Sequence, residues 1–405
     1  LSNLYMKPKN CLIFGASGQI GRNLIRRLTQ KNLKVTAVTR NLHQKGYVLK
    51  TQGNPGYLDI VETNIFDVPK IEGLIKKADV CVNLVGILFE KGFNNFTNIH
   101  EKFPSMISNL CQKHNTSKFI HLSALGIENA KESKYAKSKL KGEIAVQQNF
   151  RDSIILKPSI VYSVDDNFTT MLMGLLNLSP IFPLYYGGKT KFTPLHCSDI
   201  CNLIIDIIEN DTKYKIIECI GPEELTFKQI IEKLLKLLEK KRLLVPVPLF
   251  VAKVIATFFQ ILPKPLITKD QIKLLFYDNI PSGKYKTNVD INKNFNLRFE
   301  NEVEKYCYMW KEAGEYAKKK KKKNMISWII YLIVALILCF ILYIASQGIS
   351  RGIEAKNNNK KDSIKLKKKN SNKTISNEIK RLKKLHYEGA LSNKEFEIAK
   401  KKILS

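Results

Sequence analysis

Short apolar runs alternate along the first 156 residues with segments whose apolar positions recur at helical spacing. Residues 11–14 form an apolar run of strand length, and residues 23–28 repeat apolar side chains every three to four positions. Further strand-like runs occupy residues 34–40, 57–66, 80–86 and 118–123, with helical patterns between them. This alternation predicts an α/β fold with a doubly wound parallel sheet.

A glycine-rich turn joins the first predicted strand to the first predicted helix. A strand, a Gly-rich turn and a helix N-terminus together form a phosphate-binding corner, because glycines allow close approach and the helix N–H groups favour negative charge. The spacing is G-x-x-G-x-x-G, and glycines in a plain tight turn are the simpler alternative. The predicted cofactor-binding residues of this turn are Gly15, Ser17, Gly18, Gln19, Ile20, Gly21 and Arg22.

The end of the second predicted strand indicates which cofactor this corner binds. In such folds an acidic residue at this place bonds the 2′-OH of NAD, whereas a cation suits the 2′-phosphate of NADP. The position carries Arg40, and Arg22 could supply a second cation. Arg40 could also be a solvated strand end. We expect NADPH to be the cofactor and NAD to be the weaker ligand.

Two further strand ends carry candidate cofactor contacts. Asp67 follows the third strand, where it could meet the adenine amino group or cap the next helix. Val85 and Gly86 follow the fourth strand, and Gly86 allows the cofactor ribose to approach closely.

Three polar residues predict a reactive centre beside the cofactor. Ser123 ends the fifth strand, where ligands of open α/β sheets bind. If residues 135–149 form a helix, Tyr135 and Lys139 lie one turn apart on one face. The ammonium and a bound nicotinamide would lower the tyrosine pKa from about 10, which would make proton transfer feasible. Tyr and Lys are common in helices of this chain, so the pair alone is a weak signal.

Together these motifs resemble the short-chain dehydrogenase/reductase superfamily in its extended or atypical branch, over about residues 9–280. The resemblance rests on the glycine turn, Asp67, residues 83–86, Ser123, the Tyr135/Lys139 pair and Lys157-Pro158-Ser159. It implies a Rossmann-type NAD(P)-binding core and adds Pro158 to the cofactor contacts. No fourth catalytic Asn can be placed.

Within that branch the chain looks most like the nucleotide-binding accessory subunit of respiratory complex I. Residues 83–88, 118–123, 133–135, 157–162 and 267–271 carry this likeness. It implies a tightly held NADPH with a structural role, little turnover, and complex I subunits as partners. Two alternatives stay open. One is an active reductase, epimerase or dehydratase on a quinone-related or sugar substrate, and the other is a membrane-tethered assembly scaffold.

The domain pattern changes after the predicted core of residues 6–160. We expect a small α+β substrate domain at residues 161–317, with residues 190–220 returning to the core. An apolar, Phe-rich run at residues 249–262 is too short to span a bilayer and could be a core or an interfacial helix.

The last part of the chain has a different composition. A run of six lysines and an uncharged apolar stretch at residues 326–346 predict a transmembrane helix within residues 318–346. The composition of residues 347–377 predicts a disordered basic linker. Residues 378–405 read as a helical hairpin with a Glu388-Gly389 turn and a Ser392/Glu395 capping box. It resembles the SHOCT domain, which implies self-association or protein contact.

Charge and cysteine content narrow the classes of function. The formal net charge is +31, but the residues from Lys318 onward carry +17 of it. Without a basic stripe interleaved with aromatics, we expect no nucleic-acid partner. The eight cysteines form no C-x-x-C pair or zinc spacing, so we expect reduced core residues and no metal.

These features predict a protein on the cytoplasmic face of a bacterial inner membrane, with Met6 as its natural start. Basic residues flank both ends of the apolar stretch, so they do not settle its topology. An alternative is that the lysine run joins two neighbouring reading frames.

Overall fold

An eight-stranded, fully parallel sheet is the centre of the fold, in the order β14-β11-β6-β5-β4-β1-β2-β3. The computed structural model describes residues 9–260, 265, 267–311, 376–390 and 392–404. The strands of the sheet are β1 (Asn10–Phe14), β2 (Lys34–Thr39), β3 (Leu58–Glu62), β4 (Val80–Asn83), β5 (Lys118–Leu122), β6 (Ile154–Pro158), β11 (Ile216–Cys219) and β14 (Lys286–Thr287). The predicted Rossmann-type parallel sheet is confirmed.

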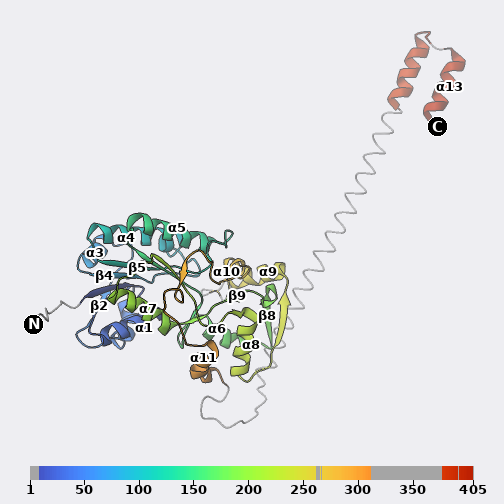
Figure 1. Ribbon diagram of the computed structural model, residues 1–405. Coiled ribbons are helices and arrows are strands. Elements are labelled where there is room, and N and C mark those ends of the chain that lie inside the picture. Colours follow the sequence, from blue (N-terminus) through green and yellow to red (C-terminus); the bar gives the residue numbers. More distant parts are fainter. Residues whose placement is uncertain (1–8, 261–264, 266, 312–375, 391, 405) are drawn as a thin grey trace, which may run out of the picture. The chain divides into compact units, whose positions relative to one another are not determined.

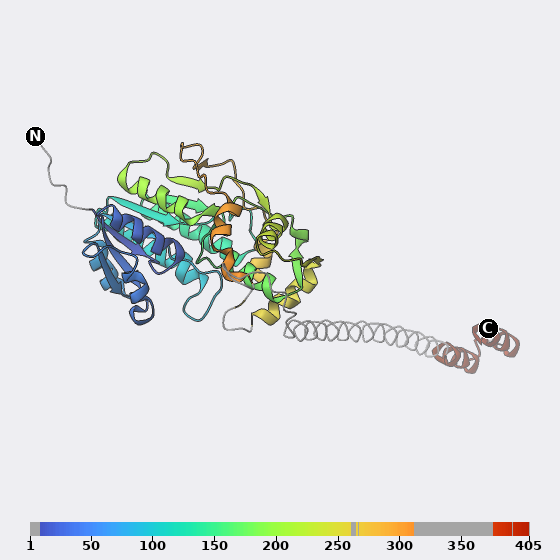
Figure 2. The same ribbon diagram turned by 90° about the horizontal axis from the view of Figure 1, so that it is seen from below.

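Helices cover both faces of this sheet (Figure 1). The helix α1 lies beside α7 on one face, also seen from below in Figure 2, and α4 lies beside α5 on the other. A buried apolar core fills each side. The helices are α1 (Gln19–Gln30), α2 (Leu42–Lys50), α3 (Val68–Ile75), α4 (Phe103–Lys113), α5 (Lys134–Asn149) and α7 (Cys197–Glu209).

The helical pattern expected between the strand-like runs 80–86 and 118–123 is divided in two. A π-helical turn spans Thr97–Lys102, and α4 begins at Phe103. Pro104 has no N–H to donate to the carbonyl of His100. The neighbouring helix approaches that carbonyl closely, since a Cβ on Gly142 would lie 1.9 Å from the His100 oxygen. The proline therefore opens the helix where α5 packs against it.

A second core lies within the same compact unit, which extends to Lys322. Its elements are β7 (Val161–Tyr162), α6 (Thr169–Leu178), β8 (Ile181–Tyr185), β9 (Lys191–Phe192), β10 (Leu195–His196), β12 (Leu225–Thr226), α8 (Phe227–Leu237), β13 (Leu243–Val247), α9 (Leu249–Phe259), α10 (Lys269–Leu274) and α11 (Phe299–Cys307). The apolar run after Pro248 forms α9, and its Ala252 and Ala256 are buried against α10.

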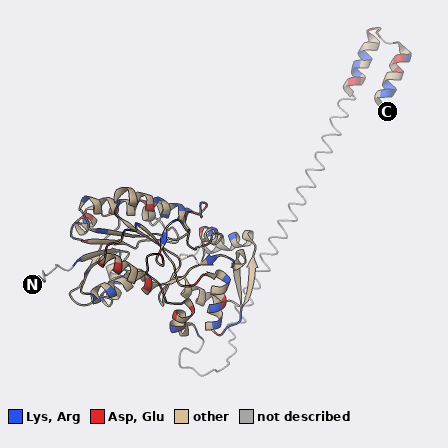
Figure 3. Cartoon of the chain, in the orientation of Figure 1, with Lys and Arg blue, Asp and Glu red and all other residues tan. Residues whose placement is uncertain are grey.

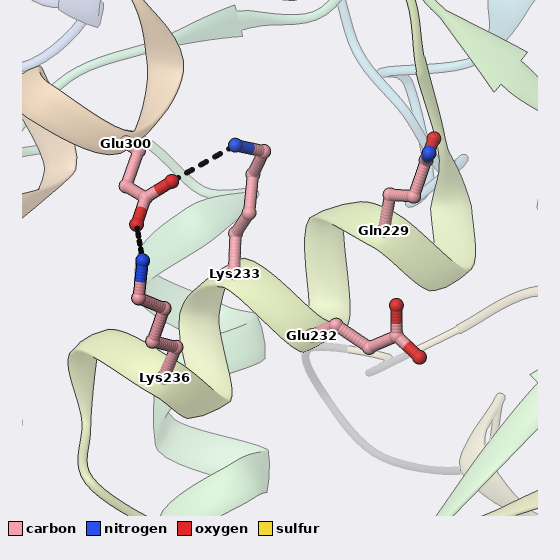
Figure 4. Close-up of a pocket in the computed structure, with 5 residues that line it drawn as sticks. All are labelled: Gln229, Glu232, Lys233, Lys236 and Glu300. Carbon is pink, nitrogen blue, oxygen red and sulfur yellow. Dashed lines mark hydrogen bonds and ion pairs between the residues drawn. The ribbon is translucent and has the colours of Figure 1, made fainter.

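Figure 4 shows a surface pocket between α8 and α11. Glu300 accepts hydrogen bonds from Lys233 at 2.9 Å and Lys236 at 2.7 Å, and Gln229 and Glu232 complete the lining. The hydrogen bonds from Lys236 and Lys233 lower the pKa of Glu300 to about 2. Glu300 thus neutralises charge on both lysines of this pocket, and Glu232 pairs with Lys228 outside the lining at 3.6 Å.

The second compact unit begins at Lys323, and its described part is a helical hairpin. Residues 376–387 are helical, Gly389 has a φ of +73°, and α13 spans Asn393–Leu404. Ser392 N donates to Glu395 Oε2 at 3.0 Å, and Glu395 N faces Ser392 Oγ at 3.5 Å. The predicted hairpin and its capping box are confirmed.

The predicted transmembrane stretch at residues 326–346 lies outside the described residues, as do most of residues 347–377. Among the residues that are described, no helix has the length and apolar character needed to cross a bilayer. In the first unit, basic and acidic side chains are interspersed over the elements (Figure 3). The seven cysteines of the described ranges are all buried and free of disulfides.

Candidate cofactor and reactive site

The glycine turn lies at the carboxyl end of β1, where the strand order reverses between β1 and β4. Gly15 has a φ of +79°, and a Cβ there would lie 2.9 Å from the Leu84 carbonyl carbon on the neighbouring chain segment. Gly18 N closes the turn by donating to Gly15 O at 3.0 Å. Gly21 is buried, and its Cβ would lie 2.5 Å from Ala16 O. The first and third glycines are therefore required by the fold itself.

The N-terminus of α1 fits the pyrophosphate of a dinucleotide. Gly18 is the N-cap, so no side chain caps the first N–H groups, and the first turn contains no acidic residue. The first N–H groups of a helix have no intrahelical acceptor, and the helix dipole favours an anion there. A bound NAD(P)H would place its pyrophosphate at these groups, with Ile20 packed behind the turn in the core.

A segment after β7 holds the polar side chains of this turn. Gln19 Nε2 donates to Ser163 Oγ at 2.9 Å. Arg22 forms an ion pair with Asp165 and donates to the Ser17 carbonyl at 2.6 Å. Arg22 is thus already neutralised. This weakens the expectation that it serves as a second cation for a 2′-phosphate.

The predicted adenosine contacts have separate roles in the fold. Arg40 is exposed at the end of β2, and its Nη1 donates to Asn94 Oδ1 at 2.8 Å. Among the described residues no acidic side chain forms an ion pair with Arg40, and the Arg40 side chain is exposed to solvent. Asp67 caps α3 by accepting from Lys70 N at 3.3 Å. Of the two roles open for Asp67, the structure shows the capping one.

The Lys139 side chain contacts both the end of β5 and the chain that follows β4. Its Nζ donates to the Leu122 carbonyl at 3.0 Å, and a Cβ on Gly86 would lie 3.5 Å from the same nitrogen. Val85 N donates to the Asn83 side chain at 3.1 Å, which fixes the backbone leading into Gly86. Gly86 therefore lies beside the Lys139 ammonium, and their roles in binding the cofactor ribose stay predictions.

Tyr135 is one turn before Lys139 on α5 and is surrounded by aromatic rings. The His100 ring centroid lies 5.3 Å from that of Tyr135, and the Phe96 centroid lies 5.9 Å away. His100 is fixed on both nitrogens: Nε2 accepts from Ile87 N at 3.1 Å, and Nδ1 lies 2.9 Å from Ser138 Oγ. The π-helical turn thus presents His100 to the predicted reactive tyrosine.

Burial shifts the pKa values of the titratable side chains around Tyr135. It raises the pKa of Tyr135 to about 12 and lowers that of Lys139 to about 8. Burial, with a contribution from Lys139, lowers the pKa of His100 to about 2, so this ring is neutral. In the protein without cofactor the pKa of Tyr135 is thus raised by burial. The lowering expected from Lys139 together with a bound nicotinamide stays a prediction.

Ser123 directly follows β5, and its side chain is close to a group of buried charged residues. Its Oγ and Glu143 Oε1 are both buried without a hydrogen bond of ordinary geometry, although the hydroxyl is near enough to lower the Glu143 pKa. Glu143 Oε2 accepts from Lys157 Nζ at 3.1 Å, and Lys157 also pairs with Glu128. Burial dominates for Glu143, whose pKa is raised. The strand bearing Lys157 continues into the buried Pro158.

Several residues of the site were missed in the sequence. His100 gave no signal because it lies within an ordinary helical pattern, four residues before Pro104. Glu143 does repeat the Tyr135/Lys139 spacing by one more turn, which could have marked it. Asp270 accepts hydrogen bonds from the start of α5 across 135 positions of sequence, and only the folded chain reveals that contact. No three His, Cys, Asp or Glu side chains in the described ranges gather as metal ligands.

Comparisons with known proteins agree with this geometry. Residues 15–168 match the NAD(P)H-binding family. The NADH-ubiquinone oxidoreductase 40 kDa subunit of Neurospora crassa is 26% identical over 281 residues, covering 69% of this chain and 74% of that protein. The mouse NADH dehydrogenase (ubiquinone) 1 alpha subcomplex subunit 9 is 24% identical over 270 residues, covering 66% and 72%.

Solved structures share the fold at low identity. UDP-glucuronic acid 4-epimerase from Bacillus cereus, in complex with UDP-glucuronic acid and NAD, superposes with a TM-score of 0.56 at 16% identity. The match covers 74% of this chain and 99% of the epimerase. The likeness establishes the fold and not a substrate.

Proposed function

The chain carries a domain of the NAD(P)H-binding, short-chain dehydrogenase-like family, and from that premise we propose that it is an NADPH-binding accessory subunit of respiratory complex I. The observation that carries the proposal is the length of the match: relatives named as subunits of this enzyme align with about 70% of the chain. The alignment therefore extends beyond the dinucleotide core into the second core, where partner contacts would lie.

The geometry supports cofactor binding, and in our proposal the cofactor is retained. The α1 N-terminus is open to a pyrophosphate, and Gly86 and Lys139 frame a ribose path. Burial raises the pKa of Tyr135 to about 12 in the protein without cofactor, so the tyrosine is protonated there. NADPH bound in this way would stabilise the folded subunit by mass action, since a ligand that binds only the folded state shifts unfolding.

An active reductase is the second candidate, because Ser123, Tyr135 and Lys139 all line the ends of β5 and α5. In that case NADPH would supply the hydride, Tyr135 would donate the proton, and Ser123 would hold the substrate oxygen. The substrate would be a quinone-related or sugar carbonyl, matching the expectation from the extended branch.

One substitution separates the two candidates. We expect Tyr135→Phe to co-purify with complex I subunits as well as the unmodified chain does, with NADPH affinity changed by less than about threefold, because the ring packing is kept. The measurement is affinity purification of the tagged full chain from its source, followed by identification of its partners and extraction of bound nucleotide. Purified chain that consumes NADPH with a metabolite, and loses this activity in Tyr135→Phe, would instead establish the reductase.

For the tail, we propose that residues 326–346 anchor the protein in the membrane that holds complex I. The relatives' names place them in mitochondria, whereas our expectation from the sequence is the cytoplasmic face of a bacterial inner membrane. The hairpin is proposed to mediate self-association, as a SHOCT-like domain would. Its helices contact one another through His386 and Asn393 at 2.7 Å.

Truncation tests these two roles separately. We expect a chain ending at residue 317 to leave the membrane fraction yet bind NADPH with unchanged affinity, because the contact boundary between the two compact units lies beyond that point. A chain ending at residue 377 should stay in the membrane and lose only crosslinked oligomers. Membrane retention of the shorter chain, or unchanged oligomers of the longer one, would contradict the respective role.

A further inference from the structure

The start of α5, which carries Tyr135, is held by a carboxylate from a distant segment. Asp270, on α10, accepts hydrogen bonds from Ser133 Oγ at 2.8 Å, Lys134 N at 2.9 Å and Tyr135 N at 3.0 Å. Two of these donors are the first N–H groups of the helix, which have no acceptor within it. The negative charge also complements the positive end of the helix dipole.

Ser133 connects this carboxylate to the next turn of α5. Its fully buried hydroxyl donates to Asp270 and accepts from Ala136 N at 3.2 Å. Asp270 is in turn fixed by its own helix, where Thr268 and Gln271 form a capping box. The position of Tyr135 therefore depends on a carboxylate whose backbone is itself anchored.

The same distant segment reaches two other strand ends of the site. Asn279 Nδ2 donates to Leu125 O at 2.6 Å, two residues after Ser123, and Asn279 Oδ1 accepts from Ser159 Oγ at 2.5 Å. The loop after β5 turns at Gly126, where φ is +74° and a Cβ would lie 3.0 Å from Asp278 O. Residues 268–279 thus contact the chain beside Ser123, Tyr135 and Pro158.

Apolar packing completes this contact. Leu274 and Tyr277 pack against Ala136 and Tyr135 on α5. On its other side, Ile272 packs with Ala252 and Ala256 of α9. The segment therefore lies between α5, which carries the predicted reactive tyrosine, and α9.

We propose that residues 268–279 act as a clasp that sets the nicotinamide end of the cofactor site, with Asp270 as its positioning residue. The clasp acts through Tyr135 and Lys139 and touches neither the glycine turn nor Arg40. This inference rests on the proposed NADPH binding. It adds that the second core positions the nicotinamide half of the cofactor site.

The test compares two ligands that share the adenosine half. NADPH reaches both ends of the site, whereas 2′,5′-ADP has no nicotinamide and reports only the glycine turn and Arg40. In the full chain we expect Asp270→Asn to raise the Kd for NADPH about tenfold and to change the Kd for 2′,5′-ADP by less than about twofold. The fluorescence of bound NADPH should also move toward that of the free cofactor, because the nicotinamide is less firmly held.

A matched control separates positioning from loss of stability. Asp290 accepts from Thr287 N at 2.8 Å and Thr287 Oγ1 at 2.9 Å beside β14, the outermost strand. Asp290→Asn also removes a carboxylate that accepts from backbone N–H, but it should leave both Kd values unchanged. If Asp270→Asn fails to fold, Ser133→Ala, which removes the hydrogen bond to Asp270 together with the N-cap bond from Ala136 N, should give the same selective loss on a smaller scale.

Equal weakening of both ligands by Asp270→Asn, or no weakening of NADPH, would overturn the clasp. Failure of the unmodified chain to bind either ligand would instead contradict the NADPH-binding function on which the clasp rests. The two failures are therefore distinguishable in one set of titrations.

Discussion

Gly18→Val is expected to weaken NADPH binding at least about 100-fold, equivalent to about 2.7 kcal/mol, while the protein stays folded. Gly18 has φ −75° and ψ 171°, an extended conformation open to any residue. A Cβ there meets one atom, Gly15 O at 3.2 Å, so the fold tolerates it after a small shift. The added isopropyl group would occupy the space at the α1 N-terminus where the pyrophosphate must lie.

Gly21→Val is the matched comparison, three residues further along the same turn. Its Cβ would lie 2.5 Å from Ala16 O and 2.6 Å from Gly15 O, and both contacts are backbone atoms that cannot move cheaply. We expect this variant to lose about 3 kcal/mol or more of unfolding free energy even without cofactor. Urea unfolding of the cofactor-free chain and NADPH titration measure the two effects. Equal destabilisation by both variants would contradict the division of roles within the turn.

The Rossmann core could be predicted because its signals are local. The strands β1 and β4 are short apolar runs with a polar boundary, and burial on both faces keeps those runs continuous. The glycine turn could be read for the same reason. Its three glycines lie within seven residues, and the strand and helix on either side both show their characteristic periods.

The protonation and restraint of the site could not be predicted, because they depend on contacts distant in sequence. The Tyr135/Lys139 spacing identified the pair but not the loss of hydration that raises the tyrosine pKa. Arg22 was expected to be a free cation, and its partner Asp165 lies 143 positions away. The strand pairing of the second core could not be predicted from the hydrophobic pattern either. Its strand β8 pairs in parallel with β13, and β13 contains Pro246.

Arg40→Asp is expected to reverse the cofactor preference. A charge-assisted contact to a phosphate contributes about 1.5–3 kcal/mol, so losing it and adding a repelling carboxylate should weaken NADPH binding by about 10- to 100-fold or more. NADH should bind more tightly than before, because an acidic residue at the end of β2 accepts from the ribose 2′-OH. Arg40 is the residue to change, since Arg22 already pairs with Asp165.

Lys34→Asp changes the net charge by the same amount at the other end of β2. It therefore controls for the effect of the protein's overall positive charge on cofactor binding. Six residues of strand separate it from the ribose site, about 17–20 Å at the rise of a β-strand. That distance exceeds the Debye length of about 8 Å at physiological ionic strength, so this variant should keep the NADPH preference. Titrations with NADPH and NADH at fixed salt decide the matter. Equal or tighter NADH binding by the unmodified chain, or a similar shift in Lys34→Asp, would show that Arg40 does not select the cofactor.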